Sequence, residues 1–202
     1  MDNIKKKALL IYLEPTPYIL GLIKNISLRW VSEVDILFVS ENISQDWGVM
    51  LDSDNITVLP VGFSGGFRLI ASLMSSGEYG IVHLAGWGHP LFLAAIVYAR
   101  FRRIPVTVET DTPLPIGLSG WKRAVKKLIY PQLFKLPSMF LPGGTRQAKY
   151  LRYYNVPNSR ISIAQMTVDV VSISEHVDAI NSTRRADIRK LLGISEDAVI
   201  FL

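Results

Sequence analysis

Residues 8–18 of this 202-residue chain read ALLIYLEPTPY, a run of six apolar or aromatic residues followed by a polar turn that holds two prolines. The run, residues 8–13, has the composition of a buried β-strand. The turn, residues 14–17, ends that strand, and residues 18–30 have a helical pattern. A strand followed at once by a helix is the repeating unit of a parallel sheet that is covered by helices.

The same alternation continues along the chain. Further strands are expected at residues 34–39, 56–59, 81–84, 106–109, 139–141 and 161–164. Helices are expected at residues 67–75, 90–102, 121–136 and 145–154. The pattern predicts a Rossmann-like α/β fold, an open and mainly parallel sheet with helices on both faces.

The C-terminal part of the chain departs from this alternation. Residues 165–183 are the least regular stretch and suit an approach to an interdomain linker. A helical pattern follows at residues 184–192, and the last five residues, AVIFL, begin a strand. We therefore expect one Rossmann-like domain over residues 1–183. Residues 184–202 are expected to be the crossover helix and first strand of a second domain that is missing from the chain.

Composition excludes several classes of protein. Hydrophobic residues make up 49% and charged residues 19%, which is typical of a globular chain and not of a disordered one. No apolar stretch approaches the roughly 20 residues of a membrane-spanning helix, and no signal peptide is recognisable. The absence of cysteine excludes disulfides and thiol catalysis. A cytoplasmic protein is expected.

Positive charge is concentrated in the middle of the chain. Residues 100–160 hold 12 Lys and Arg against two acids, Glu109 and Asp111, although the net charge of the whole chain is only +5. Such a basic region suits an anionic partner such as membrane lipid or a phosphorylated substrate, or it is simply a solvated surface. It carries no recognised nucleic-acid motif, so no nucleic-acid partner is expected.

Within this region, residues 121–129 predict a basic amphipathic helix. An apolar stripe recurs at helical spacing, and the cations occupy the other faces. We expect these cations to dock on an anionic membrane surface: Lys122, Arg123, Lys126 and Lys127. In the other interpretation the stripe packs on the sheet and the lysines are solvated, and both can hold together.

In an open α/β sheet the ligand lies beyond the carboxyl ends of the strands. Here that rule selects the loops 14–17, 61–66, 85–89, 110–120 and 142–144. Two glycine-rich segments could let a phosphate approach the backbone, residues 62–66 and Gly143-Gly144, or they are ordinary turns. Asp52-Ser53-Asp54 spells a metal-binding pattern, but its surroundings are typical of a surface turn, and no metal site is predicted.

Several of these segments resemble the N-terminal half of family 4 glycosyltransferases of the GT-B type. The resemblance rests on residues 14–18 after the first strand and on residues 103–112, RIPVTVETDT. It continues from Gly143 to Asp169 and closes with residues 189–194, RKLLGI, so that it spans essentially the whole chain. Each motif is weak alone, and their order and spacing make the case.

The resemblance implies a retaining transferase that moves a sugar from a nucleotide-sugar donor to a glycan or lipid-linked acceptor. The setting it implies is cell-surface polysaccharide or glycolipid synthesis at the inner face of the membrane. The donor is expected to bind the missing C-terminal domain, which packs against this one. This chain would then hold the acceptor, require no metal or other cofactor, and be inactive alone.

The resemblance also directs attention to the loop after the fifth strand. Asp111 stands where many members have a histidine, and it could position the acceptor or help to deprotonate it. The alternative is an Asx-type turn before Pro113. Glu109, two residues earlier, is a candidate substrate-binding residue or a paired structural acid.

Other candidates for substrate binding lie in the remaining loops. His89 could donate to a hydroxyl or phosphate, or could be a helix cap. Trp87 could stack on a sugar ring, or pack in the core. Thr16 could supply a hydroxyl where the family has two glycines, and Gly143 and Gly144 complete the set.

Two other functions stay open from the sequence. One is a stand-alone, membrane-docking partner subunit of a split glycosyltransferase. The other is a Rossmann-like binding module that catalyses nothing.

Overall fold

The computed structural model describes residues 6–30, 32–41, 43, 51, 53–114, 120–164, 170–180, 182–195 and 197–199. The chain forms two compact units, Met1–Met166 and Thr167–Leu202. The sequence-based boundary after residue 183 falls inside the second unit and stays a prediction.

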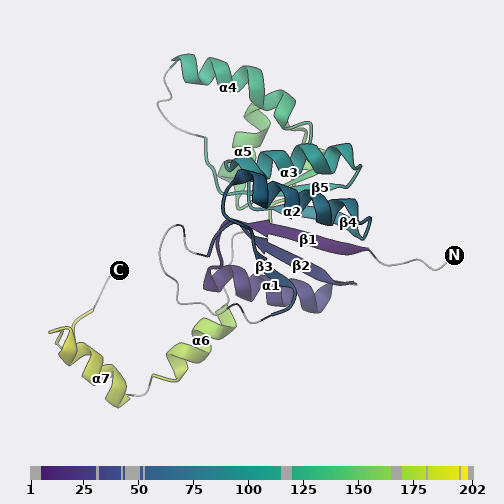
Figure 1. Ribbon diagram of the computed structural model, residues 1–202. Coiled ribbons are helices and arrows are strands. Elements are labelled where there is room, and N and C mark those ends of the chain that lie inside the picture. The colour runs from purple at the N-terminus through teal and green to yellow at the C-terminus, as the bar shows by residue number, and fades with distance from the viewer. Residues whose placement is uncertain are drawn as a thin grey trace. The chain divides into compact units, whose positions relative to one another are not determined.

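The first unit is built on a six-stranded sheet in which every neighbouring pair is parallel. The strands are β1 (Lys7–Tyr12), β2 (Val34–Phe38), β3 (Ile56–Val58), β4 (Tyr79–Leu84), β5 (Val106–Thr110) and β6 (Met139–Pro142). Their spatial order is β3-β2-β1-β4-β5-β6 (Figure 1). This order and the helices between the strands confirm the Rossmann-like α/β fold.

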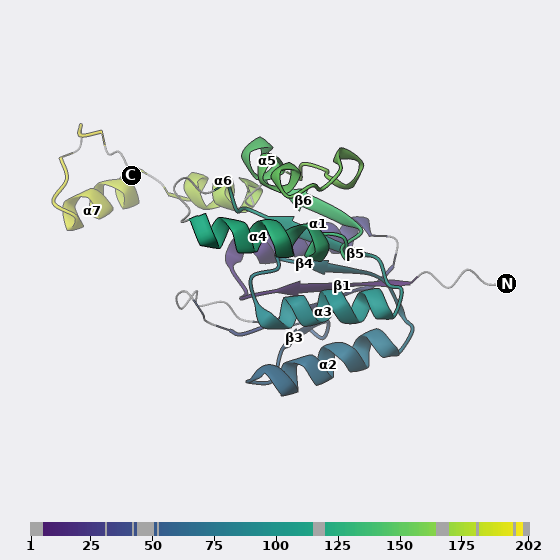
Figure 2. The same ribbon diagram turned by 90° about the horizontal axis from the view of Figure 1, so that it is seen from above.

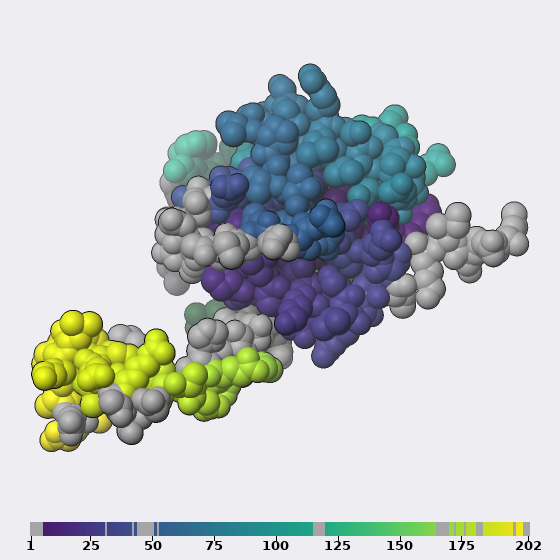
Figure 3. All heavy atoms as spheres, turned by 60° about the horizontal axis from the view of Figure 1, so that its bottom comes forward, coloured from purple at the N-terminus to yellow at the C-terminus, as the bar shows by residue number. Residues whose placement is uncertain are grey.

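Helices cover the sheet on two sides. They are α1 (Pro17–Arg29), α2 (Phe63–Ser75), α3 (Pro90–Phe101), α4 (Gly120–Leu133) and α5 (Thr145–Tyr153), with a short 3₁₀ turn at Asn158–Arg160. Helices α2 and α3 lie on one side of the sheet and α1 on the other (Figure 2). In the space-filling view α1 and α2 both reach the surface of the first unit (Figure 3).

The alternation of side chains along each strand produces two hydrophobic clusters. Leu9 and Ile11 of β1 join residues of α2, α3 and α5 in the larger one. Leu10 and Tyr12, which alternate with them, join Ile19 and other residues of α1 in the smaller one. The central strands are thus apolar on both faces, as a parallel sheet requires.

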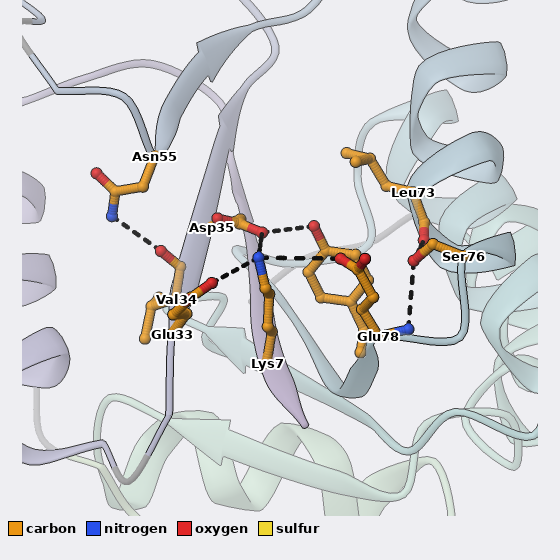
Figure 4. Close-up of polar contacts among 9 residues, drawn as sticks. Lys7, Glu33, Val34, Asp35, Asn55, Leu73, Ser76 and Glu78 are labelled. Carbon is orange, nitrogen blue, oxygen red and sulfur yellow. Dashed lines mark hydrogen bonds and ion pairs between the residues drawn. The ribbon is translucent and has the colours of Figure 1, made fainter. Parts of the chain in front are cut away.

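A polar cluster ties the amino ends of three strands together. Lys7 Nζ lies 2.5 Å from a Glu33 carboxylate oxygen and 3.9 Å from carboxylate oxygens of both Asp35 and Glu78 (Figure 4). The Tyr79 hydroxyl donates to the same Asp35 oxygen at 2.6 Å. These groups come from β1, β2, β4 and the residues just before them, at the edge opposite the candidate site.

Two expected strands differ from the structure. Residues 161–164 form only an isolated parallel bridge, Ile161 to Phe140, with hydrogen bonds from Ser162 N to Phe140 O and from Ala164 N to Pro142 O. The intervening bond from β6 cannot form because Pro142 has no N–H, so no ladder develops. Of the expected strand 198–202, residues 198 and 199 are not in a strand, and residues 200–202 lie outside the described part.

The second unit contains α6 (Val170–Asp178) and α7 (Ser182–Leu191). Helix α6 lies in the stretch that the sequence marked as irregular, so that expectation was wrong. Helix α7 confirms the helix expected at 184–192 within two residues. After it, the Arg189 guanidinium donates to the carbonyls of Ser195 and Ala198, which holds the turn that follows Gly193.

Candidate functional site

The strand order reverses direction between β1 and β4, and this is where an open α/β sheet offers a crevice. The chain leaves β1 toward α1 and leaves β4 toward α3, and these helices belong to different hydrophobic clusters. The two loops therefore diverge and leave the carboxyl ends of β1, β4 and β5 as the natural position for a ligand.

Four polar side chains gather on one face of the sheet at this position. His83 pairs in register with Thr107, and its Nδ1 lies 2.9 Å from the Thr107 hydroxyl. Its Nε2 lies 3.4 Å from a carboxylate oxygen of Glu109. The ring of Tyr12, the last residue of β1, is 5.7 Å from the His83 ring between centroids. We call Tyr12, His83, Thr107 and Glu109 the switch-point cluster.

The members of the switch-point cluster differ in their access to solvent. Tyr12 is buried, and among the described residues its hydroxyl has no hydrogen-bond partner. Burial raises the pKa of the Tyr12 phenol, and the negative charge of Glu109 raises it further. The phenol therefore stays protonated. The Glu109 side chain is 35% exposed against 14% for His83, so the carboxylate is the group that an entering ligand meets.

This arrangement has a definite chemical capacity. An ionised carboxylate accepts hydrogen bonds from sugar hydroxyls and can take a proton. His83 stands behind Glu109 and is itself fixed by Thr107, so the carboxylate is oriented. A buried polar group without a partner, such as the Tyr12 hydroxyl, is uncommon and marks a place where packing was not optimised for stability alone.

Asp111 lies beyond the end of β5 and is exposed. In the described part of the chain its carboxylate makes no hydrogen bond, while its carbonyl accepts one from Gln147 Nε2 at 3.1 Å. The turn bond of this loop comes instead from Thr110, whose hydroxyl accepts the Thr112 N–H. The carboxylate of Asp111 is therefore exposed, one residue beyond the end of β5 and two residues after Glu109.

Gly143 and Gly144 connect this loop to α5. The Gly143 N–H donates to the Thr110 carbonyl at 2.9 Å, and Gly144 is the N-cap residue of α5. A Cβ on Gly144 would lie 3.2 Å from the side-chain oxygen of Gln147. Gly143 thus ties the β6 loop to the end of β5, and Gly144 begins α5.

Thr16 and His89 each cap a helix at the two sides of the crevice. The Thr16 hydroxyl accepts from Ile19 N at 3.4 Å at the start of α1. Nδ1 of His89 accepts from Leu91 N at 3.2 Å at the start of α3, which leaves Nε2 as the free ring nitrogen. His89 is half-buried and keeps Nε2 for a ligand, whereas Thr16 is buried and serves as the helix cap.

Trp87 lies in the β4–α3 loop but within an aromatic group. Its ring centroid is 4.8 Å from that of Phe134 and 6.1 Å from that of Tyr150, to which it is stacked. The indole is part of the packing around the larger cluster, where the core interpretation placed it.

The glycine-rich start of α2 has a packing role. A Cβ on Gly66 would lie 2.9 Å from Leu91 Cδ1, and one on Gly65 would lie 3.0 Å from Pro60. These glycines allow α2 to approach α3 and its own loop closely. Gly62 has φ +90, a conformation that suits glycine at the N-cap of α2.

Metal binding finds no support in the described residues, among which no group of three or more His, Asp or Glu could hold an ion. Asp52 of the Asp-x-Asp pattern lies outside them. Nor does any helix in the described ranges have the length and apolar character needed to cross a membrane.

Sequence reasoning missed most of the switch-point cluster. It selected Glu109, and it did not include His83, Tyr12 or Thr107 among the candidate site residues. Their common signal is positional: each lies on the face of the sheet that Glu109 shares, on the neighbouring strands β1, β4 and β5. Finding it requires the strand order, which places β1, β4 and β5 side by side.

Comparison with known proteins gives a fold and no sequence family. No protein-family model and no curated protein matches the sequence. UDP-N-acetylglucosamine 2-epimerase from Rickettsia bellii is 11% identical, with a TM-score of 0.57 over 95% of this chain and 52% of that one. The Neisseria meningitidis 2-epimerase bound to UDP-GlcNAc is 12% identical, with a TM-score of 0.55 over 95% and 55%.

Anabaena HepE in complex with UDP has a TM-score of 0.60 at 12% identity, over 93% of this chain and 50% of that one. The chain thus spans about half the length of the solved structures it matches. The fold of this chain is that of a GT-B-like domain. These neighbours do not show the finer resemblance to family 4 glycosyltransferases.

Proposed function

We propose that this chain is the N-terminal domain of an enzyme that acts on a nucleotide-activated sugar, with the sugar or its acceptor at the switch-point cluster. The observation that supports this most is the position of the Glu109 carboxylate. It is partly exposed, oriented by His83, and placed at the carboxyl edge of β5, next to the reversal of strand order.

The reaction that we favour is glycosyl transfer with retention, as the resemblance implies. In that reaction Glu109 and Asp111 bind hydroxyls of the acceptor, and one of them takes the proton of the attacking hydroxyl. The nucleotide is held by a further domain. The free ring nitrogen of His89 lies in the loop after β4, and the buried Thr16 caps α1 in the loop after β1.

A second reaction, sugar epimerisation, is favoured by the neighbours, two of which are UDP-GlcNAc 2-epimerases. Where inversion at a sugar carbon proceeds by removal and return of its proton, one group takes the proton and another returns it. Glu109 is again the candidate base, so both reactions depend on the same carboxylate.

Turnover by the natural protein that contains this chain tests the proposal. The protein is incubated with a panel of nucleotide sugars, with and without a mixture of glycan and lipid-linked acceptors. Acceptor-dependent release of the nucleotide supports transfer, and a new sugar signal in the NMR spectrum without nucleotide release supports epimerisation. Both signals should fall sharply in Glu109→Gln.

Turnover that appears only on adding a separate nucleotide-binding protein would replace the proposal with the split-enzyme alternative. Binding of the nucleotide sugar without turnover would replace it with the binding module. The absence of both binding and turnover would refute it.

A further inference from the structure

Helix α4 turns its apolar stripe away from the protein. None of its residues is buried. The four apolar residues of the stripe are 45–77% exposed: Trp121, Val125, Leu128 and Ile129. The interpretation in which this stripe packs on the sheet is therefore wrong.

The contacts of α4 explain this orientation. Tyr130 and Leu133 pack against the larger hydrophobic cluster, and Phe134 just beyond the helix is buried in it. At about 100° per residue, Tyr130 lies nearly opposite Trp121 on the helix. Packing through Tyr130 therefore directs Trp121 and its neighbours outward, at the periphery of the first unit (Figure 1).

Cations occupy the other faces of α4, and no acid lies in the helix. Lys126 Nζ lies 5.5 Å from the Tyr130 ring centroid, and Lys127 Nζ lies 5.3 Å from that of Tyr153. Lys122 lies over the Trp121 ring at 5.7 Å. With Arg123, the helix carries four cations, of which Lys122 borders the apolar stripe and the other three lie farther round the helix.

We propose that α4 docks the protein on an anionic lipid surface, with the stripe at the boundary of headgroups and acyl chains. An exposed apolar stripe with only cations around it is the pattern of an interfacial helix. A second copy of the chain fits less well, because it would bring four more positive charges against these four. This inference is independent of the reaction catalysed.

Vesicle co-sedimentation of the natural protein tests the proposal. Vesicles of phosphatidylcholine with about 30% phosphatidylglycerol should bind it, and pure phosphatidylcholine should bind it far less. Binding should fall as NaCl rises from about 0.1 M to about 0.5 M. On anionic vesicles the tryptophan fluorescence should shift to the blue, and Trp121→Phe should abolish most of that shift.

Two sets of variants separate the contribution of the cations to vesicle binding from that of the apolar stripe. At roughly fivefold per cation, replacing all four by glutamine should weaken binding by on the order of several hundred-fold. Trp121→Ser, Val125→Ser and Leu128→Ser together should also abolish binding, without loss of folding, because these side chains are exposed. Control substitutions at exposed sites elsewhere should leave binding unchanged: Lys24→Gln, Arg29→Gln and Arg68→Gln for charge, Val97→Ser and Phe101→Ser for the stripe.

Several outcomes would overturn the proposal. They are equal binding to neutral vesicles, no binding to either kind, or binding that the α4 variants do not change. Self-association that the stripe variant removes, in a protein that ignores vesicles, would assign the helix to a second copy instead.

Discussion

His83 of β4 and Glu109 of β5 face each other across neighbouring strands, with Nε2 and a carboxylate oxygen 3.4 Å apart. The contact lies next to the place where the strand order reverses, and a hydrogen bond between His83 Nδ1 and the Thr107 hydroxyl supports it. It therefore positions a partly exposed carboxylate where this fold class binds its ligands.

Replacing Glu109 by glutamine tests the role of that carboxylate. The substitution keeps the shape and removes the charge, so turnover should fall by about 10²- to 10⁴-fold if the group moves a proton. Glu78→Gln is the matched control, because Glu78 lies at the opposite edge of the sheet near Lys7. Steady-state turnover of both variants makes the comparison, and equal turnover would remove Glu109 from the reaction.

Two tyrosine substitutions should change stability in opposite directions. Tyr12→Phe removes a buried hydroxyl that has no partner, so the free energy of unfolding should stay the same or rise by up to about 1 kcal/mol. Tyr79→Phe removes the hydroxyl that donates to Asp35 and should cost about 1–2 kcal/mol. Urea unfolding measures both. A large loss of stability in Tyr12→Phe would show that its hydroxyl does have a partner.

Replacing Gly66 by alanine should push α2 away from α3 and lower stability. The new Cβ would lie 2.9 Å from Leu91 Cδ1, and Leu91 is buried and cannot move aside freely. A loss of about 1–2 kcal/mol is expected, net of the gain in helix propensity. Gly120→Ala, also in a helix but with nothing within 4 Å, should be neutral or stabilising. If thermal unfolding shows that Gly120→Ala is less stable than Gly66→Ala, this account of the packing is wrong.

Stability should fall at alkaline pH. Burial, and then the bond to Asp35, raises the pKa of Tyr79 above its ordinary value of 10.0, and burial raises that of Tyr12. The unfolded chain therefore loses these phenol protons first as the pH rises. The stabilisation is fully present below about pH 10 and is lost above it. Urea unfolding at about pH 8 and about pH 11 checks this, and the Tyr12→Phe, Tyr79→Phe double variant should lose less between the two.

The fold was predictable because its signals are local. The run at residues 8–13 and its successors mark the strands by composition, and Pro90 marks the start of a helix. At residues 161–164, where the predicted strand did not form, the cause was a single chemical feature. Pro142 could not donate the bond that would have made residues 161–164 a strand.

The candidate site was predictable only in part, because it depends on which strands are neighbours. Glu109 and Asp111 could be selected from their place after a strand. His83 and Tyr12 could not, since each looks like a core residue until β1, β4 and β5 are adjacent. For α4, spacing predicted the stripe, but only the packing of Tyr130 reveals that the stripe faces outward.

A crystal structure of the natural protein with a bound nucleotide sugar, and with an acceptor where one has been found, would test the central claim most directly. We predict that a sugar hydroxyl lies within hydrogen-bond distance, about 2.7–3.2 Å, of the Glu109 carboxylate, at the carboxyl ends of β4 and β5. A structure in which sugar and acceptor both lie elsewhere, with no contact to Glu109, His83 or Asp111, would contradict it.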